Sequence, residues 1–239
     1  AEKSDHPVIV AGSVGPTGEI LEPVGGLSHA DAVAAFEEQI SGLLEGGVDV
    51  IWAETISSEE EIRAVSEAAA NLNAPFCATL SFDTAGRTMM GVTSSGYAKI
   101  ASSLAASPIA IGANCGTGAP DLLRTVMGIA DAAPDRVIIA KGNAGIPKYV
   151  DGHIHYDGTP ELMADYARLA RDAGARLIGG CCGTQPEHLV AMRAALESHV
   201  PGARPTLEEI AAKVGDFSSE SDGTGDTESP ERPRRRRRR

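Results

Sequence analysis

Long hydrophobic runs are absent from this chain of 239 residues. A membrane-spanning helix needs about 18 or more apolar residues in sequence, and no stretch approaches that length. The first residues, Ala1 to His6, are polar and show no signal-peptide pattern. We therefore expect a cytoplasmic protein with no membrane partner.

Cysteine is scarce, with four residues in the whole chain. Four are too few for a disulfide scaffold in a protein of this size, and in a reducing compartment clustered cysteines more often bind metal or do chemistry. The hydrophobic content of 42% is enough for one sizeable core, so one main domain is expected. What matters next is where the few cysteines stand.

Positive charge is scarce outside the C-terminus. The net charge of -12 includes seven arginines among the last eight residues (Arg232 and 234–239), so the preceding part sums to -19. A body this acidic repels nucleic acid, and we expect no nucleic-acid partner. Residues 218–231 are rich in Ser, Asp, Gly and Glu. We therefore predict a domain over residues 1–216 and a disordered tail over 217–239, whose arginine run we interpret as a solvated segment that folds back on the acidic body.

Short β-rich runs alternate with helical patterns along the domain. A helix after the second run is predicted from a capping box at Ser57 or Ser58 and an apolar stripe from Ile62 to Leu72. Strict alternation predicts a parallel sheet with right-handed crossovers. The six predicted strands are Val8–Ala11, Val48–Ala53, Phe76–Phe82, Ile109–Ala113, Val137–Ala140 and Arg176–Ile178.

The polar residues favour an α/β barrel over a doubly wound sheet, because they fall where strands run into the following loops. That end of the strands forms the active face of a barrel. Only six strand-helix units are found, whereas a closed barrel needs eight. We therefore expect a (βα)8 TIM-type barrel truncated at the N-terminus to about six units. The strand-end residues are Glu54, Ser81, Cys115, Lys141 and Cys181.

Three of the four cysteines form a candidate metal site. Cys181 and Cys182 lie in a Gly-Gly-Cys-Cys-Gly sequence, and Cys115 stands at another predicted strand end in Gly-Ala-Asn-Cys-Gly. Glycines permit the turn that lets two adjacent thiols reach one ion. Three sulfur ligands with an open fourth position are typical of a catalytic zinc site.

Other interpretations of these residues remain open. The adjacent cysteines could be buried and inert, or joined in a strained vicinal disulfide. A histidine as fourth ligand (His153, His155 or His188) would convert the site to a closed, structural one. The remaining cysteine, Cys77, lies inside a strand pattern, where we expect a small buried hydrophobe.

Three thiolates already neutralise the charge of zinc, so the ion would be a weak Lewis acid toward water. Such a site suits the binding of a substrate thiol in the open position, where the thiol loses its proton and stays nucleophilic at neutral pH. The chemistry predicted from the ligand set is S-alkylation.

The cysteine motifs resemble those of the zinc-dependent homocysteine S-methyltransferase family, most closely its bacterial betaine-homocysteine members. The resemblance runs from about Val8 to Leu196 and includes Gly-Ser-Val-Gly-Pro at 12–16 and Lys-Gly-Asn-Ala-Gly at 141–145. It implies a (βα)8 barrel in which Cys115, Cys181 and Cys182 hold zinc. It also implies substrate-binding roles for Glu54, toward the amino group of homocysteine, and for Asn143. No catalytic residue is implied beyond the activated substrate thiolate.

The chain departs from the family pattern in two places. The family's first strand, which helps to hold the amino acid, has no counterpart. Thr55 stands where the animal betaine enzymes carry an aromatic residue, although quaternary ammonium groups are recognised by aromatic faces. The donor is therefore less well specified by the sequence than the acceptor.

The leading hypothesis is a zinc-dependent enzyme that transfers a methyl group from betaine to the thiol of homocysteine, giving methionine. One alternative is the homocysteine-binding module of a cobalamin-dependent methionine synthase. An alternative of another class is a non-catalytic zinc-binding barrel fragment. The expected partners are these small molecules, and a homo-oligomer is compatible with the sequence.

Overall fold

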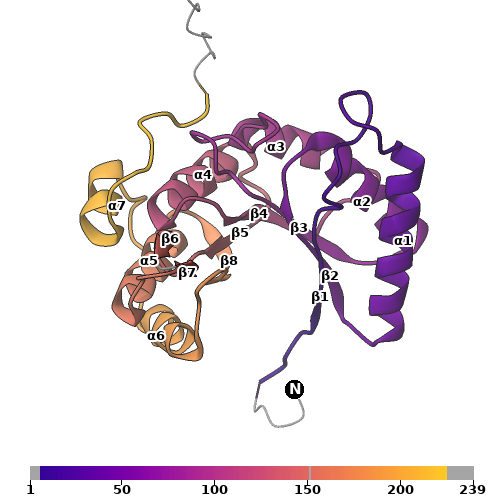
Figure 1. The fold of residues 1–239 in the computed structure, drawn as a ribbon. Coiled ribbons are helices and arrows are strands. Elements are labelled where there is room, and N and C mark those ends of the chain that lie inside the picture. The colour runs from indigo at the N-terminus through magenta and orange to yellow at the C-terminus, as the bar shows by residue number, and fades with distance from the viewer. Residues whose placement is uncertain (1–5, 151, 225–239) are drawn as a thin grey trace, which may run out of the picture.

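Six parallel strands form one curved sheet in the computed structural model, which describes residues 6–150 and 152–224. The strands pair in the order β1-β2-β3-β4-β5-β8, so each main strand neighbours the next along the chain. Helices cover the convex side (Figure 1). The strands are β1 (Ala11–Val14), β2 (Val50–Ile56), β3 (Phe76–Leu80), β4 (Ala110–Cys115), β5 (Val137–Gly142) and β8 (Ala175–Gly180).

The predicted alternation of strands and helices is confirmed. Each main strand is followed by a helix on the outside of the sheet, as in the outer ring of an α/β barrel. The helices are α1 (His29–Glu45), α2 (Glu59–Asn71), α3 (Ser94–Ala101), α4 (Ala119–Ala132), α5 (Pro160–Asp172), α6 (Pro186–Glu197) and α7 (Leu207–Val214). Among the described residues, no helix combines the length and apolarity that crossing a membrane requires.

Side-chain caps determine where several helices begin. The hydroxyl of Ser58 accepts the backbone N–H of Glu61 at 3.1 Å, which identifies Ser58 as the N-cap of α2. Thr159 caps α5 in the same way, with Pro160 in its first turn. The apolar stripes of the outer helices pack on the sheet, and Phe36 and Ile62 are buried there.

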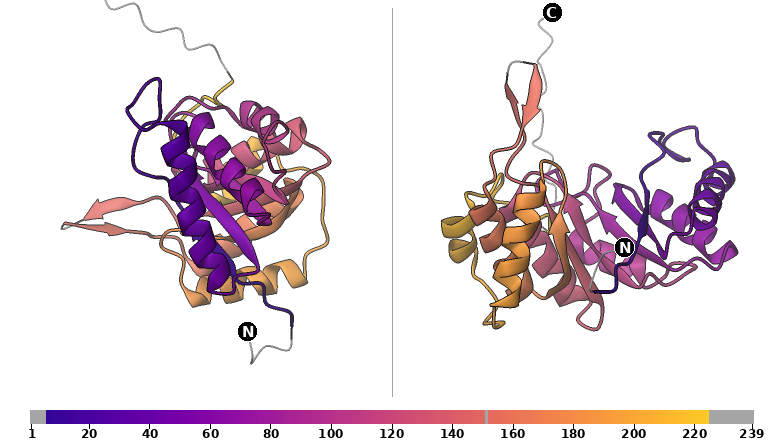
Figure 2. Two further views of the ribbon diagram at one scale, coloured as in Figure 1. Left: turned by 90° about the vertical axis from the view of Figure 1, so that its right-hand side faces the viewer. Right: turned by 90° about the horizontal axis from the view of Figure 1, so that it is seen from below.

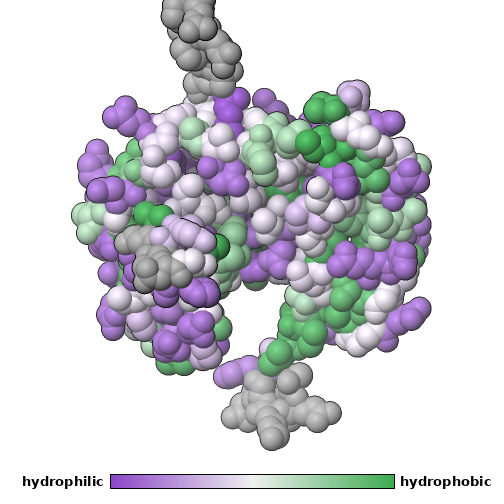
Figure 3. All heavy atoms as spheres, in the orientation of Figure 1, coloured by the Kyte–Doolittle hydropathy of each residue, from purple (hydrophilic) through white to green (hydrophobic). Residues whose placement is uncertain are grey.

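The first strand lies three residues later than the sequence predicts. The apolar run Val8–Val10 is exposed, and sheet pairing begins only where Ala11 stands opposite Val50. Hydrophobicity alone indicated burial, but this segment lies at an open edge of the sheet. Figure 3 shows apolar side chains beside an opening in the surface at this edge.

The long loop between β5 and α5 contains a hairpin that the sequence analysis did not predict. Its two antiparallel strands are β6 (Lys148–Val150) and β7 (His153–His155). The hairpin projects from the body on the side of the carboxyl ends of the strands (Figure 2).

Part of the predicted tail lies against the body. Phe217 packs under the guanidinium of Arg124, with 4.8 Å from Cζ to the ring centroid, and the N–H of Ser218 donates to Asp121 at 2.9 Å. Arg124 also donates to the carbonyl of Ser219 at 2.9 Å. The segment 217–224 thus follows the amino end of α4, whereas the arginine run lies outside the described residues.

The pair of Asp121 and Arg124 gives a test of this packing. Both side chains are less than a tenth exposed and bond at 2.7 Å, so Asp121→Ala leaves a buried guanidinium without its carboxylate. We expect a loss of about 3 kcal/mol in the free energy of unfolding, measured with urea. The matched control is Asp131→Ala on the same helix, whose exposed pair with Arg204 should contribute less than about 1 kcal/mol. Equal losses in the two variants would contradict this account.

Candidate active site

The three predicted metal-ligating thiols meet at the carboxyl ends of β4 and β8. Cys115 is the last residue of β4, and Cys181 and Cys182 directly follow β8. Their Sγ atoms all lie within 4.8 Å of one another, and those of Cys115 and Cys182 are 3.6 Å apart. All four cysteines are free thiols, so no vicinal disulfide is present.

The spacing of the sulfur atoms fits one tetrahedral ion. Three thiolates at about 2.3 Å from a zinc ion lie about 3.8 Å from one another in tetrahedral geometry. The observed separations lie close to this value, so small side-chain movements would suffice to complete the coordination. The donor set of three soft sulfurs is one that selects zinc over magnesium or calcium.

Histidines do not join this cluster in the described part of the chain. His188 is buried, and both ring nitrogens are engaged: Nδ1 accepts the N–H of Gln185 at 2.8 Å, and Nε2 bonds the carbonyl of Gly158 at 2.9 Å. His153 and His155 lie on the exposed strand β7. The three thiols therefore leave a fourth side of the cluster open to a ligand.

A turn held by backbone contacts presents the adjacent thiols. The N–H of Cys181 donates to the carbonyl of Gly142 at 2.7 Å, which extends the pairing of β8 with β5 by one residue. The N–H of Cys182 donates to Oδ1 of Asn143 at 3.1 Å, and Nδ2 of Asn143 donates to the carbonyl of Gly116 at 3.1 Å. Asn143 thus links the two cysteine loops.

Asn114 is a second linking residue, which sequence reasoning missed. Its buried Oδ1 accepts the N–H of Thr55 at 2.8 Å and the hydroxyl of Thr79 at 2.7 Å. Its Nδ2 donates to the hydroxyl of Thr55 at 2.8 Å and toward Sγ of Cys181 at 3.7 Å. Its place immediately before a strand-end cysteine was the available signal.

Two residues of the site adopt left-handed backbone conformations. Thr55 has φ of 64° and Cys115 has φ of 60°. These values are costly for side chains with a Cβ, above all for the β-branched threonine, and such strain concentrates at functional sites. Both residues are held by neighbours, Thr55 through Asn114 and the Cys115 loop through Asn143.

The thiols influence one another's acidity. The hydrogen bond with Cys115, helped by the amide of Asn114 and the charge of Lys141, lowers the pKa of Cys181 to about 5, although burial opposes this shift. The same contact with Cys181, together with burial, raises the pKa of Cys115 well above its usual range. One thiolate thus forms readily in the cluster, as a metal site requires.

Tyr156, at the base of the hairpin, covers the thiols from the loop side. Its ring packs so closely over Gly183 that a Cβ there would lie 2.3 Å from the ring. Burial, followed by its hydrogen bond with Cys182, raises the pKa of Tyr156 to about 12. Sequence reasoning did not single out this aromatic residue.

A pocket beside the thiols contains the predicted residue Glu54. Its volume is about 370 Å³, and it lies on the inner side of the sheet between β1, β2, β5 and β8. Oε1 of Glu54 accepts the hydroxyl of Ser13 at 2.7 Å, and Oε2 pairs with Nζ of Lys141. Nζ of Lys141 also lies 5.3 Å from the centroid of the Trp52 ring. The lining residues are Ala11, Ser13, Trp52, Glu54, Ile139, Lys141, Leu177, Ile178 and Gly179.

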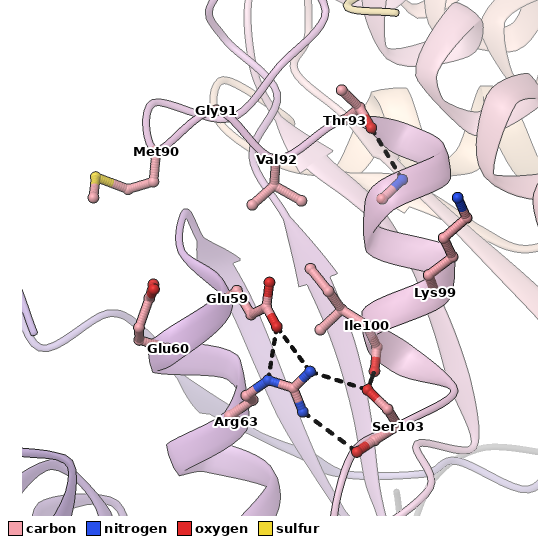
Figure 4. A pocket seen from close by; sticks show the side chains of 11 residues that line it. Glu59, Glu60, Arg63, Met90, Gly91, Val92, Thr93, Lys99, Ile100 and Ser103 are labelled. Carbon is pink, nitrogen blue, oxygen red and sulfur yellow. Dashed lines mark hydrogen bonds and ion pairs between the residues drawn. The ribbon is translucent and has the colours of Figure 1, made fainter.

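A larger hollow of about 570 Å³ lies on the outside, between α2 and α3 (Figure 4). There Arg63 pairs with Glu59 at 2.7 Å and donates to Oγ of Ser103 at 3.0 Å. This hollow is lined by residues from outer helices and the loop before α3, and none of the cysteines lines it. The cysteines do not line the smaller pocket either, but Gly179 in its wall lies two residues before Cys181, and both Glu54 and Lys141 line it. The smaller pocket is therefore the candidate site.

Comparisons with known proteins identify the same fold. The chain is similar to the homocysteine methyltransferase MmuM from Escherichia coli in its apo form, with 24% identity and a TM-score of 0.64 over 79% of this chain and 62% of that chain. The metallated form of MmuM matches with 24% identity and a TM-score of 0.61, over 78% and 61% of the two chains. At this identity the likeness establishes the fold, and the chain spans about 62% of the length of MmuM.

The family is identified independently of the solved structures. The model of the family described as homocysteine S-methyltransferase matches residues 1–196, a range that contains all three clustered cysteines and Glu54. Because this match covers most of the sequence, the chain belongs to the homocysteine S-methyltransferase family.

Proposed function

We propose that this chain carries the zinc and homocysteine sites of an enzyme that methylates the thiol of homocysteine to give methionine. The cluster of Cys115, Cys181 and Cys182 beside a charged pocket is the observation that supports the proposal. Zinc held by three thiolates supplies a fourth position at which a substrate thiol loses its proton and remains nucleophilic at neutral pH.

The proposed roles of the protein residues follow from their contacts. Glu54 would accept the ammonium group of homocysteine, since its carboxylate is only about a fifth exposed and lines the pocket. Asn143 would act on the substrate site indirectly. Its side-chain amide is hydrogen-bonded to Cys182 at one end and to Gly116 at the other. The remaining role of the barrel would be to hold the thiol in line with the methyl carbon. Such orientation can lower the activation free energy by several kcal/mol.

We further propose betaine as the methyl donor. Trp52 already receives a cation, the ammonium of Lys141, on its ring face, and Tyr156 lies beside Cys182. Aromatic faces of this kind attract quaternary ammonium groups. Tyr156 therefore supplies aromatic surface next to the thiols for the quaternary ammonium of betaine, whereas the face of Trp52 is taken by Lys141 and Thr55 is not aromatic.

Zinc content tests the metal site. We expect one zinc per chain with three sulfur ligands, rising to four on addition of homocysteine, by elemental analysis and X-ray absorption. Cys115→Ser should retain less than about half an equivalent, because two thiolates hold zinc far more weakly than three. Cys77→Ala is the matched control, since Cys77 is buried in β3 and outside the cluster. Full zinc retention in Cys115→Ser would refute the assignment.

The variant Asn114→Ala tests whether the side-chain amide of Asn114 holds the thiol cluster in place. The change leaves the N–H of Thr55 and the hydroxyl of Thr79 without their buried acceptor, so we expect a loss of about 2 kcal/mol or more in stability. Zinc should also transfer faster to a chelator, because Cys181 loses its amide donor. The control is Asn71→Ala, whose exposed side chain bonds Glu37 at the surface. Unchanged chelation kinetics in Asn114→Ala would show that the amide does not support the metal site.

Turnover with different donors tests the reaction. With zinc and homocysteine present, we expect methionine to form from betaine, measured by mass spectrometry. Formation from methylcobalamin alone would instead support the module of a cobalamin-dependent synthase, and formation from S-methylmethionine alone would identify a sulfonium donor. Binding of homocysteine without turnover of any donor would support the non-catalytic zinc-binding alternative.

A further inference from the structure

Lys141 occupies a position in the pocket that the proposed function leaves without a role. Among the described residues that line the pocket, it is the one cation and Glu54 is the one anion. Both side chains are about a fifth exposed, and they pair with each other across the pocket. The other lining groups are mostly aliphatic, so this pair dominates the charge of the pocket wall.

The substrate of the proposed function carries two charges on its α-carbon. An ammonium group can bind Glu54, but a carboxylate in a mostly apolar pocket also needs a partner, because an unpaired buried charge is costly. A recognition site for an α-amino acid must therefore supply a donor close to Glu54.

Four backbone donors near the thiols are already engaged. The N–H groups of Cys181 and Cys182 donate to Gly142 and Asn143 respectively, and that of Ala144 donates to the carbonyl of Cys182. The N–H of Thr55 donates to Asn114. A carboxylate that bound any of these four groups would displace a bond, whereas the ammonium of Lys141 lines the pocket itself.

Lys141 also lies on β5, the strand that neighbours both thiol-bearing strands. It is the penultimate residue of β5, and its stem passes over Gly179 on β8, with Cγ 3.7 Å from where a Cβ of Gly179 would lie. Lys141 therefore lies on the strand between the two thiol-bearing strands, β4 and β8, and its side chain reaches Glu54 of β2 within the pocket.

We propose that Lys141 binds the α-carboxylate of the thiol substrate, and that the zwitterionic head of the amino acid inserts between Lys141 and Glu54. One ion pair of the free protein is thereby exchanged for two, with no change in the net charge of the pocket. The face of Trp52 keeps the lysine ammonium in place while Glu54 turns to the substrate ammonium. This inference rests on the proposed function, since it assumes that homocysteine enters this pocket.

Two analogues of homocysteine separate the roles of the paired charges. Mercaptopropylamine lacks the carboxylate and mercaptobutyrate lacks the amino group, while both keep the thiol. The full chain is loaded with cobalt(II), whose absorption changes when an added thiol coordinates, and dissociation constants are measured for the three thiols by titration.

We expect wild type to bind homocysteine about tenfold or more tightly than either analogue. Lys141→Met should weaken homocysteine binding about tenfold and abolish its preference over mercaptopropylamine. Glu54→Gln should instead abolish the preference over mercaptobutyrate. Lys99→Met, which removes an exposed lysine of α3, is the matched control and should behave as wild type.

Lys141→Arg keeps a cation at the position and provides a second test if Lys141→Met folds poorly. We expect it to retain part of the preference for homocysteine over mercaptopropylamine. Complete loss of that preference in Lys141→Arg, or an unchanged preference in Lys141→Met, would overturn the role of Lys141. Either result would leave the proposed function standing. If no thiol changes the cobalt spectrum of wild type, the proposed function fails and the role of Lys141 fails with it.

Discussion

At the carboxyl end of the sheet, one buried amide bonds to groups from three other segments. Asn114, on β4, holds Thr55 of β2, Thr79 of β3 and the thiol of Cys181 after β8. Because the amide is inaccessible to water, none of these bonds competes with solvent, and the loss of one would leave a buried polar group unpaired. The spacing of the thiols is thus tied to the alignment of the strands.

The same amide accounts for the strained backbone next to it. A left-handed threonine costs of order 1–3 kcal/mol and persists only where its surroundings hold it there. Asn114 bonds both the N–H and the hydroxyl of Thr55, so the conformation is fixed from two sides. This places the bend of β2 directly after Glu54, and the register of β2 on β3 shifts at the same point. Asn114 therefore connects the bend that follows Glu54 with the thiol of Cys181.

The sequence predicted the parts of the site that depend on local signals. The paired cysteines, Cys115 and Glu54 could be found because residue type and strand-end position are both visible in the sequence. The hydrogen bonds of Asn114 and the ion pair of Lys141 with Glu54 could not be predicted from the sequence. Asn114 and Thr55 are 59 positions apart, and Lys141 and Glu54 are 87 positions apart. The strand predicted over Val8–Ala11 was placed three residues too early for a related reason: an apolar run says nothing of whether a neighbouring strand pairs with it.

Charge gives a physical reason for the methyl donor proposed above. In the proposed site, three thiolates around a divalent zinc ion would leave one net negative charge, and a bound substrate thiolate would make two. The pair of Glu54 and Lys141 is neutral, and so is the zwitterionic head of an amino acid, so neither offsets this excess. In a half-buried site with low local dielectric, the excess attracts a donor that carries positive charge next to the transferred methyl group. The proposed transfer would remove the positive charge of the donor and the negative charge of the thiolate together, so the field of the site would become less negative as the reaction proceeds. An onium donor such as betaine satisfies this requirement, whereas a neutral methyl donor would leave the thiolate charge without a counterpart before transfer.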